Sequence, residues 1–402
     1  MTFHGFTRRA GALAAALSLG ALTACSGNTD TAADVASGVA AIGPSAATSP
    51  ATTTDCTLAT RNPAKVVCLA NAFLGTLSTA QRDSVVRPLS STLAVRWSNL
   101  PCALSCRNGI LLGSLSATQR AAALNLVRVA LSTEGFSQHE QHRIADSILA
   151  TVGGGGGGTP PGAGTPPGAG APPGAGTPPG GGGGGYGAGV YVVAFLGTPS
   201  TTTPWILQLG GHHLAINLAY NGTATPTPTP YHTGIEPQAF TVNGVTYTPL
   251  QARKIAVYTL VNSLDAAQYA QAQISGTFTD LLLGPGQDGK FPATRQGIPA
   301  SALTAAQQQF VKTAIEAWVK DFPTAEANAV LASYEDPATL ANTYVGSSGG
   351  RDSTVQGSYI RIDGPRVWIE FVAQNGVLYQ NQIHFHTIWR DRQTDYGGFF
   401  AF

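Results

Sequence analysis

Residues 358–372 read Ser-Tyr-Ile-Arg-Ile-Asp-Gly-Pro-Arg-Val-Trp-Ile-Glu-Phe-Val, and this stretch decides the fold class. Its two ends, residues 358–362 and 367–372, are rich in β-branched and aromatic residues, which is typical of strands. Asp363-Gly364 between them indicates a tight turn, although Pro365 leaves the turn type open. The stretch therefore predicts an antiparallel hairpin.

Similar runs occur on both sides of a helical region. We predict strands at residues 190–196, 205–209, 212–220 and 382–389. Helices are predicted between the two groups of strands, at residues 249–273, 304–320 and 323–334. Strands in groups, separated by a run of helices, favour an α+β fold with a largely antiparallel sheet.

Four segments of the form Leu-x-x-x-Gln mark predicted helix starts. They lie at residues 77–81, 115–119, 264–268 and 303–307. In each, the second residue can cap a backbone N–H while the Gln reaches back, as in a capping box. Arg107 precedes Gln119 by the same spacing as Arg295 precedes Gln307. The match predicts a repeated helical unit packed on the sheet, with both arginines as buried or capping residues rather than an anion site.

Two segments of biased composition divide the chain. Residues 153–186 are a Gly/Pro tract, which predicts an extended linker. It separates a helical part with disulfides, residues 56–152, from an α+β domain with histidine motifs, residues 187–402. Residues 25–55 carry almost no large apolar side chain and are predicted to be a disordered tether.

Residues 1–24 are typical of a lipoprotein signal peptide. Arg8-Arg9 precedes an uncharged apolar run, residues 10–21, which is too short to span a hydrocarbon core of about 30 Å. The run ends in Leu22-Thr23-Ala24-Cys25, which resembles the lipobox of bacterial lipoproteins. We therefore predict lipidation of Cys25 and a place in the cell envelope, anchored to the membrane and facing the periplasm or the exterior. An ordinary secretory signal with a chance cysteine is the alternative.

The remaining cysteines agree with export. They are Cys56, Cys68, Cys102 and Cys106, and an even number in an exported chain predicts disulfides. Of the three possible pairings, Cys56–Cys68 with Cys102–Cys106 keeps both loops short. The net charge of +1, with 11% charged residues, gives no electrostatic basis for binding nucleic acid.

The candidate chemistry lies on two predicted strands that carry histidine pairs. His384 and His386 occupy alternate positions, so both should project from one face, as two ligands of one metal ion would. His212 and His213 should lie on opposite faces of another strand, and we favour His213 because its face is smaller and more polar. Histidines near strand ends are often structural, which is the alternative interpretation.

Glu370 and Asp391 are the nearest candidates for a carboxylate that orients a metal-bound imidazole or acts as a general base. These residues predict a divalent metal ion of unspecified identity and a metal-dependent hydrolase. No serine-hydrolase elbow, phosphate-binding loop or dinucleotide fingerprint is present in the sequence. The alternative function is a non-catalytic lipoprotein that binds a small molecule or an envelope component.

The combination of motifs resembles the family catalogued as domain of unknown function 3500. The resemblance rests on Pro204-Trp205, Gly211-His212-His213-Leu214 and His384-x-His386-x-x-Trp389-Arg390-Asp391-x-x-x-Asp395-Tyr396-Gly397. Residues 77–81 and the block from Arg107 to Gln119 also match, so both halves are covered. The family pattern Ile-Glu-Tyr-Asp-Asn is only partly kept, because Val372-Ala373 replaces its Asp-Asn pair. The resemblance implies homology and brings no known activity.

Overall fold

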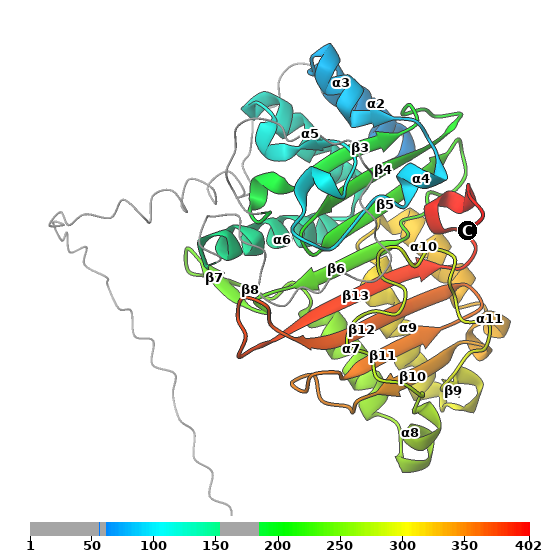
Figure 1. Cartoon of the computed structure of the whole chain (residues 1–402). Coiled ribbons are helices and arrows are strands. Elements are labelled where there is room, and N and C mark those ends of the chain that lie inside the picture. The colour runs from blue at the N-terminus through cyan, green and yellow to red at the C-terminus, as the bar shows by residue number, and fades with distance from the viewer. Residues whose placement is uncertain (1–55, 57–61, 153–184) are drawn as a thin grey trace, which may run out of the picture.

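The computed structural model describes residue 56, residues 62–152 and residues 185–402. The predicted signal peptide, the tether with Cys25 and residues 153–184 of the predicted linker lie outside these residues. The described part contains one mixed sheet of 11 strands and ten α-helices, so the predicted α+β class is confirmed (Figure 1).

The strand order in the large sheet is β1-β3-β4-β5-β6-β13-β12-β11-β10-β9, and β2 also pairs with β3. The strands are β1 (Val86–Arg87), β2 (Ile110–Leu111), β3 (Val192–Leu196), β4 (Pro204–Gly211), β5 (Leu214–Asn221), β6 (Tyr231–Ile235), β9 (Ile298–Pro299), β10 (Tyr344–Ser348), β11 (Tyr359–Asp363), β12 (Val367–Asn375) and β13 (Ile383–Asp391). β7 (Phe240–Val242) and β8 (Val245–Tyr247) form a separate hairpin. Only β1 and β3 pair in parallel among the described strands, which confirms the largely antiparallel sheet.

The helices agree with the prediction except at one break. They are α2 (Asn62–Gly75), α3 (Thr79–Val85), α4 (Ser91–Ala94), α5 (Ala117–Ala130), α6 (Thr133–Val152), α7 (Gln251–Asn262), α8 (Ala266–Ala272), α9 (Ala305–Val319), α10 (Thr324–Tyr334) and α11 (Pro337–Ala341). The single helix predicted at 249–273 is wrong, because Asp265 caps a new helix and divides it into α7 and α8. None of the described helices is long and apolar enough to cross a membrane.

All four predicted capping boxes are formed, at Ser78, Ser116, Asp265 and Thr304. Their glutamines also bind one another in pairs, Gln81 with Gln119 and Gln268 with Gln307. The caps are therefore confirmed, whereas a repeated helical unit stays a prediction.

The predicted hairpin of residues 358–372 is confirmed as β11 and β12, closed by a 2.7 Å hydrogen bond from the Gly364 N–H to the Val367 carbonyl. The part before the linker is not purely helical, because β1 and β2 both pair with β3 beyond it. Residues on both sides of the linker therefore contribute to one sheet. The preferred disulfides are also found, Cys56–Cys68 and Cys102–Cys106, with Cα atoms 5.5 and 5.9 Å apart.

The two faces of the sheet are covered differently. On β13 the helix face carries Phe385, Thr387 and Trp389, and Thr387 accepts a hydrogen bond from Trp318 of α9. α7 and α9 lie behind the sheet in the view of Figure 1. The opposite face, called the loop face, carries His384, His386, Ile388 and Arg390 of β13. Short helix α4 and segments without regular structure cover much of it, so His384 and His386 lie on the side away from α7 and α9.

Candidate metal centre

His213 lies in a two-residue turn between β4 and β5, so the strand predicted at 212–220 begins two residues too early. The backbone of His213 is left-handed, with φ of 60°, a conformation that costs a non-glycine residue about 1–2 kcal/mol. Hydrogen bonds hold it there: the His213 N–H donates to the Asn99 carbonyl at 3.0 Å, and its carbonyl accepts from the Gly234 N–H at 2.7 Å. The turn therefore imposes an unfavourable backbone on this histidine.

Arg107 and Tyr191 fix the rest of the turn. The buried Arg107 guanidinium donates to the Gly211 carbonyl at 2.6 Å and to the carbonyls of Ser98 and Leu100. The Tyr191 hydroxyl donates to the His212 carbonyl at 2.9 Å. Arg107 is thus a buried structural residue, as the sequence predicts, and its carbonyl contacts make it a clamp on the turn.

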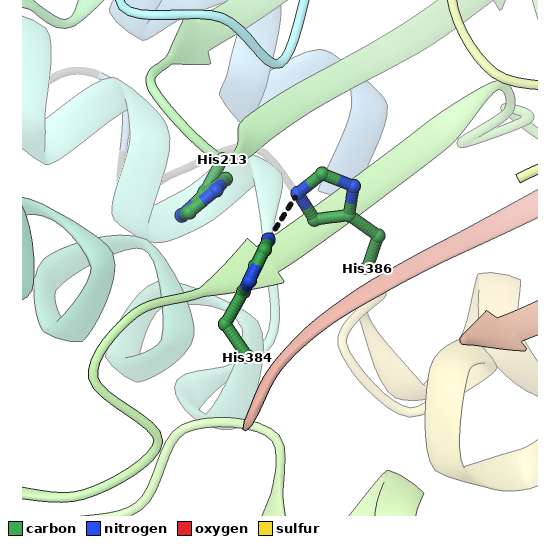
Figure 2. A group of neighbouring side chains, drawn as sticks. All are labelled: His213, His384 and His386. Carbon is green, nitrogen blue, oxygen red and sulfur yellow. Dashed lines mark hydrogen bonds between the residues drawn. The ribbon is translucent and has the colours of Figure 1, made fainter. Parts of the chain in front are cut away.

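His384 and His386 project from the loop face of β13, as their spacing predicts. The Nδ1 of His384 lies 2.7 Å from the Asn375 carbonyl, so this nitrogen carries the proton and Nε2 keeps a free lone pair. The two Nε2 atoms face each other at 3.3 Å (Figure 2). The ring of His386 lies beside Gly234 of β6, its register partner, where a side chain would collide with it.

The turn and the strand bring three imidazoles together. One ring nitrogen each of His213, His384 and His386 lies within 4.8 Å of the other two, and the residues are 7%, 3% and 6% exposed. Figure 2 shows the rings converging from the turn and from β13. The motifs are therefore far closer than the roughly 10 Å that would prevent one ion from joining them.

Burial sets the charge of this group. It lowers the pKa of His384 to about 3 and the pKa of His213 well below its usual value, and neighbouring histidines lower both further. Both imidazoles are therefore neutral at neutral pH and available as ligands.

Asp280 supplies a carboxylate that the sequence did not reveal. Its Oδ1 lies 2.9 Å from Nδ1 of His386, which directs the Nε2 of that ring toward His384. Partial burial of Asp280 raises the pKa of its carboxyl, but the attraction and hydrogen bond of His386 outweigh it and hold this pKa well below its usual range. Asp280 lies in a segment without strand or helix periodicity, so no sequence pattern pointed to it.

His212 does not belong to the group. Its Nδ1 lies 2.8 Å from Oδ1 of buried Asp146 in α6, and its ring stacks on His213 with centroids 3.7 Å apart. The prediction that the two side chains occupy opposite faces is wrong, because both lie in the turn rather than on a strand. His232 of β6 is also close, 5.4 Å from His386 between centroids, but it is not among the three converging residues.

The two carboxylates predicted from the sequence lie elsewhere. Glu370 shares the loop face but is bonded to Tyr359, Trp368 and the backbone of residues 282 and 283. Asp391 is on the helix face, where it accepts from the Tyr334 hydroxyl at 2.9 Å and from Arg366. Neither joins the histidine group, because Asp391 has the opposite parity on β13 and Glu370 is saturated by other donors.

The strained turn gives a matched pair of variants. His213→Gly and His213→Ala both remove the imidazole, but only alanine has a Cβ that disfavours a φ of 60°. We expect the glycine variant to exceed the alanine variant by about 1 kcal/mol in free energy of unfolding, measured by urea titration. Equal stabilities would mean that His213 does not keep this backbone conformation.

Comparison with known proteins places the chain in a family. No curated protein and no solved structure matches it. The model of the family described as Protein of unknown function (DUF3500) matches residues 60–398, a range that contains the turn at His213 and the whole of β13. The chain therefore belongs to the DUF3500 family, as its histidine motifs suggested.

Proposed function

We propose that this protein is a metal-dependent hydrolase of the cell envelope, with a divalent ion held by His213, His384 and His386. The observation that carries the proposal is the 3.3 Å approach of two Nε2 atoms whose rings are both oriented by their Nδ1 atoms. An imidazolium at His386 would donate across this gap, but when both rings are neutral with the proton on Nδ1, two lone pairs face each other in a buried site. A cation between them removes this repulsion.

The distances suit a tetrahedral ion. Two imidazole nitrogens at about 2.05 Å from one ion and at the tetrahedral angle lie roughly 3.3–3.4 Å apart. His384 and His386 already have this separation. The three ligand atoms span up to 4.8 Å, so His213 must move inward when the ion binds.

The ligand set supports hydrolysis. Three imidazoles leave one position of a four-coordinate ion open, and water bound to such an ion ionises near neutral pH, which makes it a nucleophile. Asp280 fixes the ring of His386 from behind, as carboxylates commonly do for metal-bound histidines. Among the described residues, no cysteine of the kind found in copper electron-transfer sites joins the group.

Metal analysis of protein purified from its native envelope tests the proposal. We expect a stoichiometric divalent ion by mass spectrometry, and hydrolysis of a panel of chromogenic esters and phosphoesters that a chelator abolishes and Zn²⁺ restores. Protein that contains no metal and takes up none would instead support a non-catalytic lipoprotein that binds a small molecule or envelope component.

We also propose that the protein is exported and attached to the membrane through lipidated Cys25. The signal-like residues 1–24 and the lipobox support this, and so do the two disulfides, since disulfides persist mainly in oxidising compartments. The substrate would then be a small molecule or component of the envelope.

Cys25→Ser tests the anchor. We expect the variant to lose labelling by a radioactive fatty acid and to leave the membrane fraction, because the thiol is the acceptor of the lipid. Ser26→Ala, one residue further on, is the control and should keep both properties. Unchanged labelling of the Cys25→Ser variant would contradict lipidation at this residue.

A further inference from the structure

We propose that Glu370 is a positioning residue of the metal centre, acting at a distance through the backbone segment that carries Asp280. The inference rests on the proposed metal site but concerns a different question, namely what holds Asp280 against His386. From the sequence, Glu370 is predicted to belong to the catalytic group itself. Its contacts show instead that it holds the segment next to that group.

The Glu370 carboxylate is a clamp on residues 282 and 283. It has no exposed surface, and it accepts the Leu282 N–H at 2.5 Å and the Leu283 N–H at 2.8 Å. Tyr359 and Trp368 donate to the same carboxylate at 2.8 and 2.7 Å. Four donors on one buried carboxylate hold it in place, so the two backbone amides are fixed to β12.

Neighbouring side chains fasten the same segment. Arg390 of β13 is buried and donates to the Leu283 carbonyl at 2.8 Å and to the Gly284 carbonyl at 3.2 Å. On the other side of Asp280, the Gln374 side chain of β12 donates to the Thr279 carbonyl at 2.8 Å. Asp280 thus lies between backbone groups that are hydrogen-bonded to side chains of β12 and β13.

Asp280 depends on these anchors because little else holds it. The segment between Ile274 and Ile298 forms no helix and no strand, and a connection of this length without regular structure is usually functional. The Asp280 side chain is 54% exposed and packs little surface of its own. Within the described part of the chain, its side chain forms hydrogen bonds with His386 and with the neighbouring Leu281 N–H.

A chain of contacts therefore runs from Glu370 through residues 281–283 to Asp280 and then to His386. Releasing the clamp should leave the three ligands in place but remove the carboxylate that orients one of them. Loss of such a partner typically lowers metal affinity about 10–100-fold. If Glu370 acts through Asp280, the two effects should not add.

The test is a double-mutant cycle on the full-length protein with Zn²⁺ as the probe. We expect Glu370→Gln and Asp280→Ala each to weaken Zn²⁺ binding by about tenfold or more, and the double variant to be no weaker than Asp280→Ala alone. Gln374→Ala, at a half-buried site, should show the same non-additivity if Glu370→Gln does not fold. If the losses in Zn²⁺ binding free energy add fully in the double variants, the proposal is overturned.

Asp391→Asn is the matched control. Asp391 is also a buried carboxylate that accepts two successive backbone N–H groups, at 2.8 and 3.0 Å, but those belong to residues 393 and 394. We expect this variant to lower the free energy of unfolding without changing the affinity for Zn²⁺. An equal loss of Zn²⁺ affinity would show that any weakened clamp disturbs the site, and would remove the specific role of Glu370.

A second measurement does not need metal. In the metal-free protein, nitrogen NMR should show the proton of His386 on Nδ1, as its contact with Asp280 requires. Glu370→Gln and Gln374→Ala should convert this signal to a mixture of tautomers. An unchanged signal would overturn the positioning role, whereas wild-type protein that binds no Zn²⁺ would overturn only the proposed function.

Discussion

Replacing His384 and His386 together by alanine is expected to abolish metal binding, from one ion for each chain to none detectable. The two Nε2 atoms at 3.3 Å form the tightest part of the group, and a single remaining imidazole cannot hold a divalent ion at micromolar concentration. The fold should persist, because the backbone pairing of β13 with β6 and β12 does not depend on these side chains. Mass spectrometry of the purified variant and circular dichroism measure the two properties.

His139→Ala is the matched control for this pair. His139 of α6 is equally buried and hydrogen-bonded to Glu140, but it lies outside the converging group. We expect it to retain the ion even if its stability falls. Retention of metal by the His384→Ala/His386→Ala variant, in a folded state, would mean that the ion is bound elsewhere.

The position of β13 and the facing of its histidines could be predicted because they follow from period two alone. Alternate residues of a strand share a face, so His384 and His386 had to lie together whatever their neighbours were. The partner turn was harder. The predicted strands, residues 205–209 and 212–220, left Gly210-Gly211 between them, but Gly211 belongs to β4, where a Cβ would lie 2.4 Å from the Tyr191 ring. The turn consequently falls on His212 and His213.

The positions of the carboxylates could be predicted only in part from the sequence. The parity of Asp391 was available from the sequence and already placed it opposite the histidines. Glu370 is different, because its face relative to His386 depends on the register of β12 against β13, which no local pattern encodes. Asp280 approaches His386 through a segment without periodicity, and only the folded chain brings the two together. Strand β6 was also missed, since a five-residue run that includes Gly234 gives a weak strand signal.

Gly234→Ala is expected to damage the centre although it replaces none of the proposed ligands. The backbone conformation of residue 234 is open to any amino acid. A Cβ there, however, would lie 2.7 Å from Cδ2 of His386 and 2.9 Å from Cδ2 of His213. Ordinary contact begins at 3.4 Å, so both rings must move apart. Overpacking of this kind costs about 1–3 kcal/mol. If the rings relax when no ion is bound, this cost falls on metal binding. Since 1.4 kcal/mol corresponds to a factor of ten, Zn²⁺ affinity should then fall about 5- to 150-fold, as titration calorimetry would measure.

Gly75→Ala provides the comparison, because an added Cβ at the end of α2 meets nothing within 4 Å. We expect it to leave Zn²⁺ affinity unchanged and to raise stability by at most about 1 kcal/mol, because alanine has less backbone freedom to lose than glycine. If Gly234→Ala lowered stability while Zn²⁺ affinity stayed at the wild-type value, the two rings would not be joint ligands of one ion. Steric pressure on Gly234 reaches His213 and His386 at the same time, so this single methyl group tests whether the turn and β13 form one site.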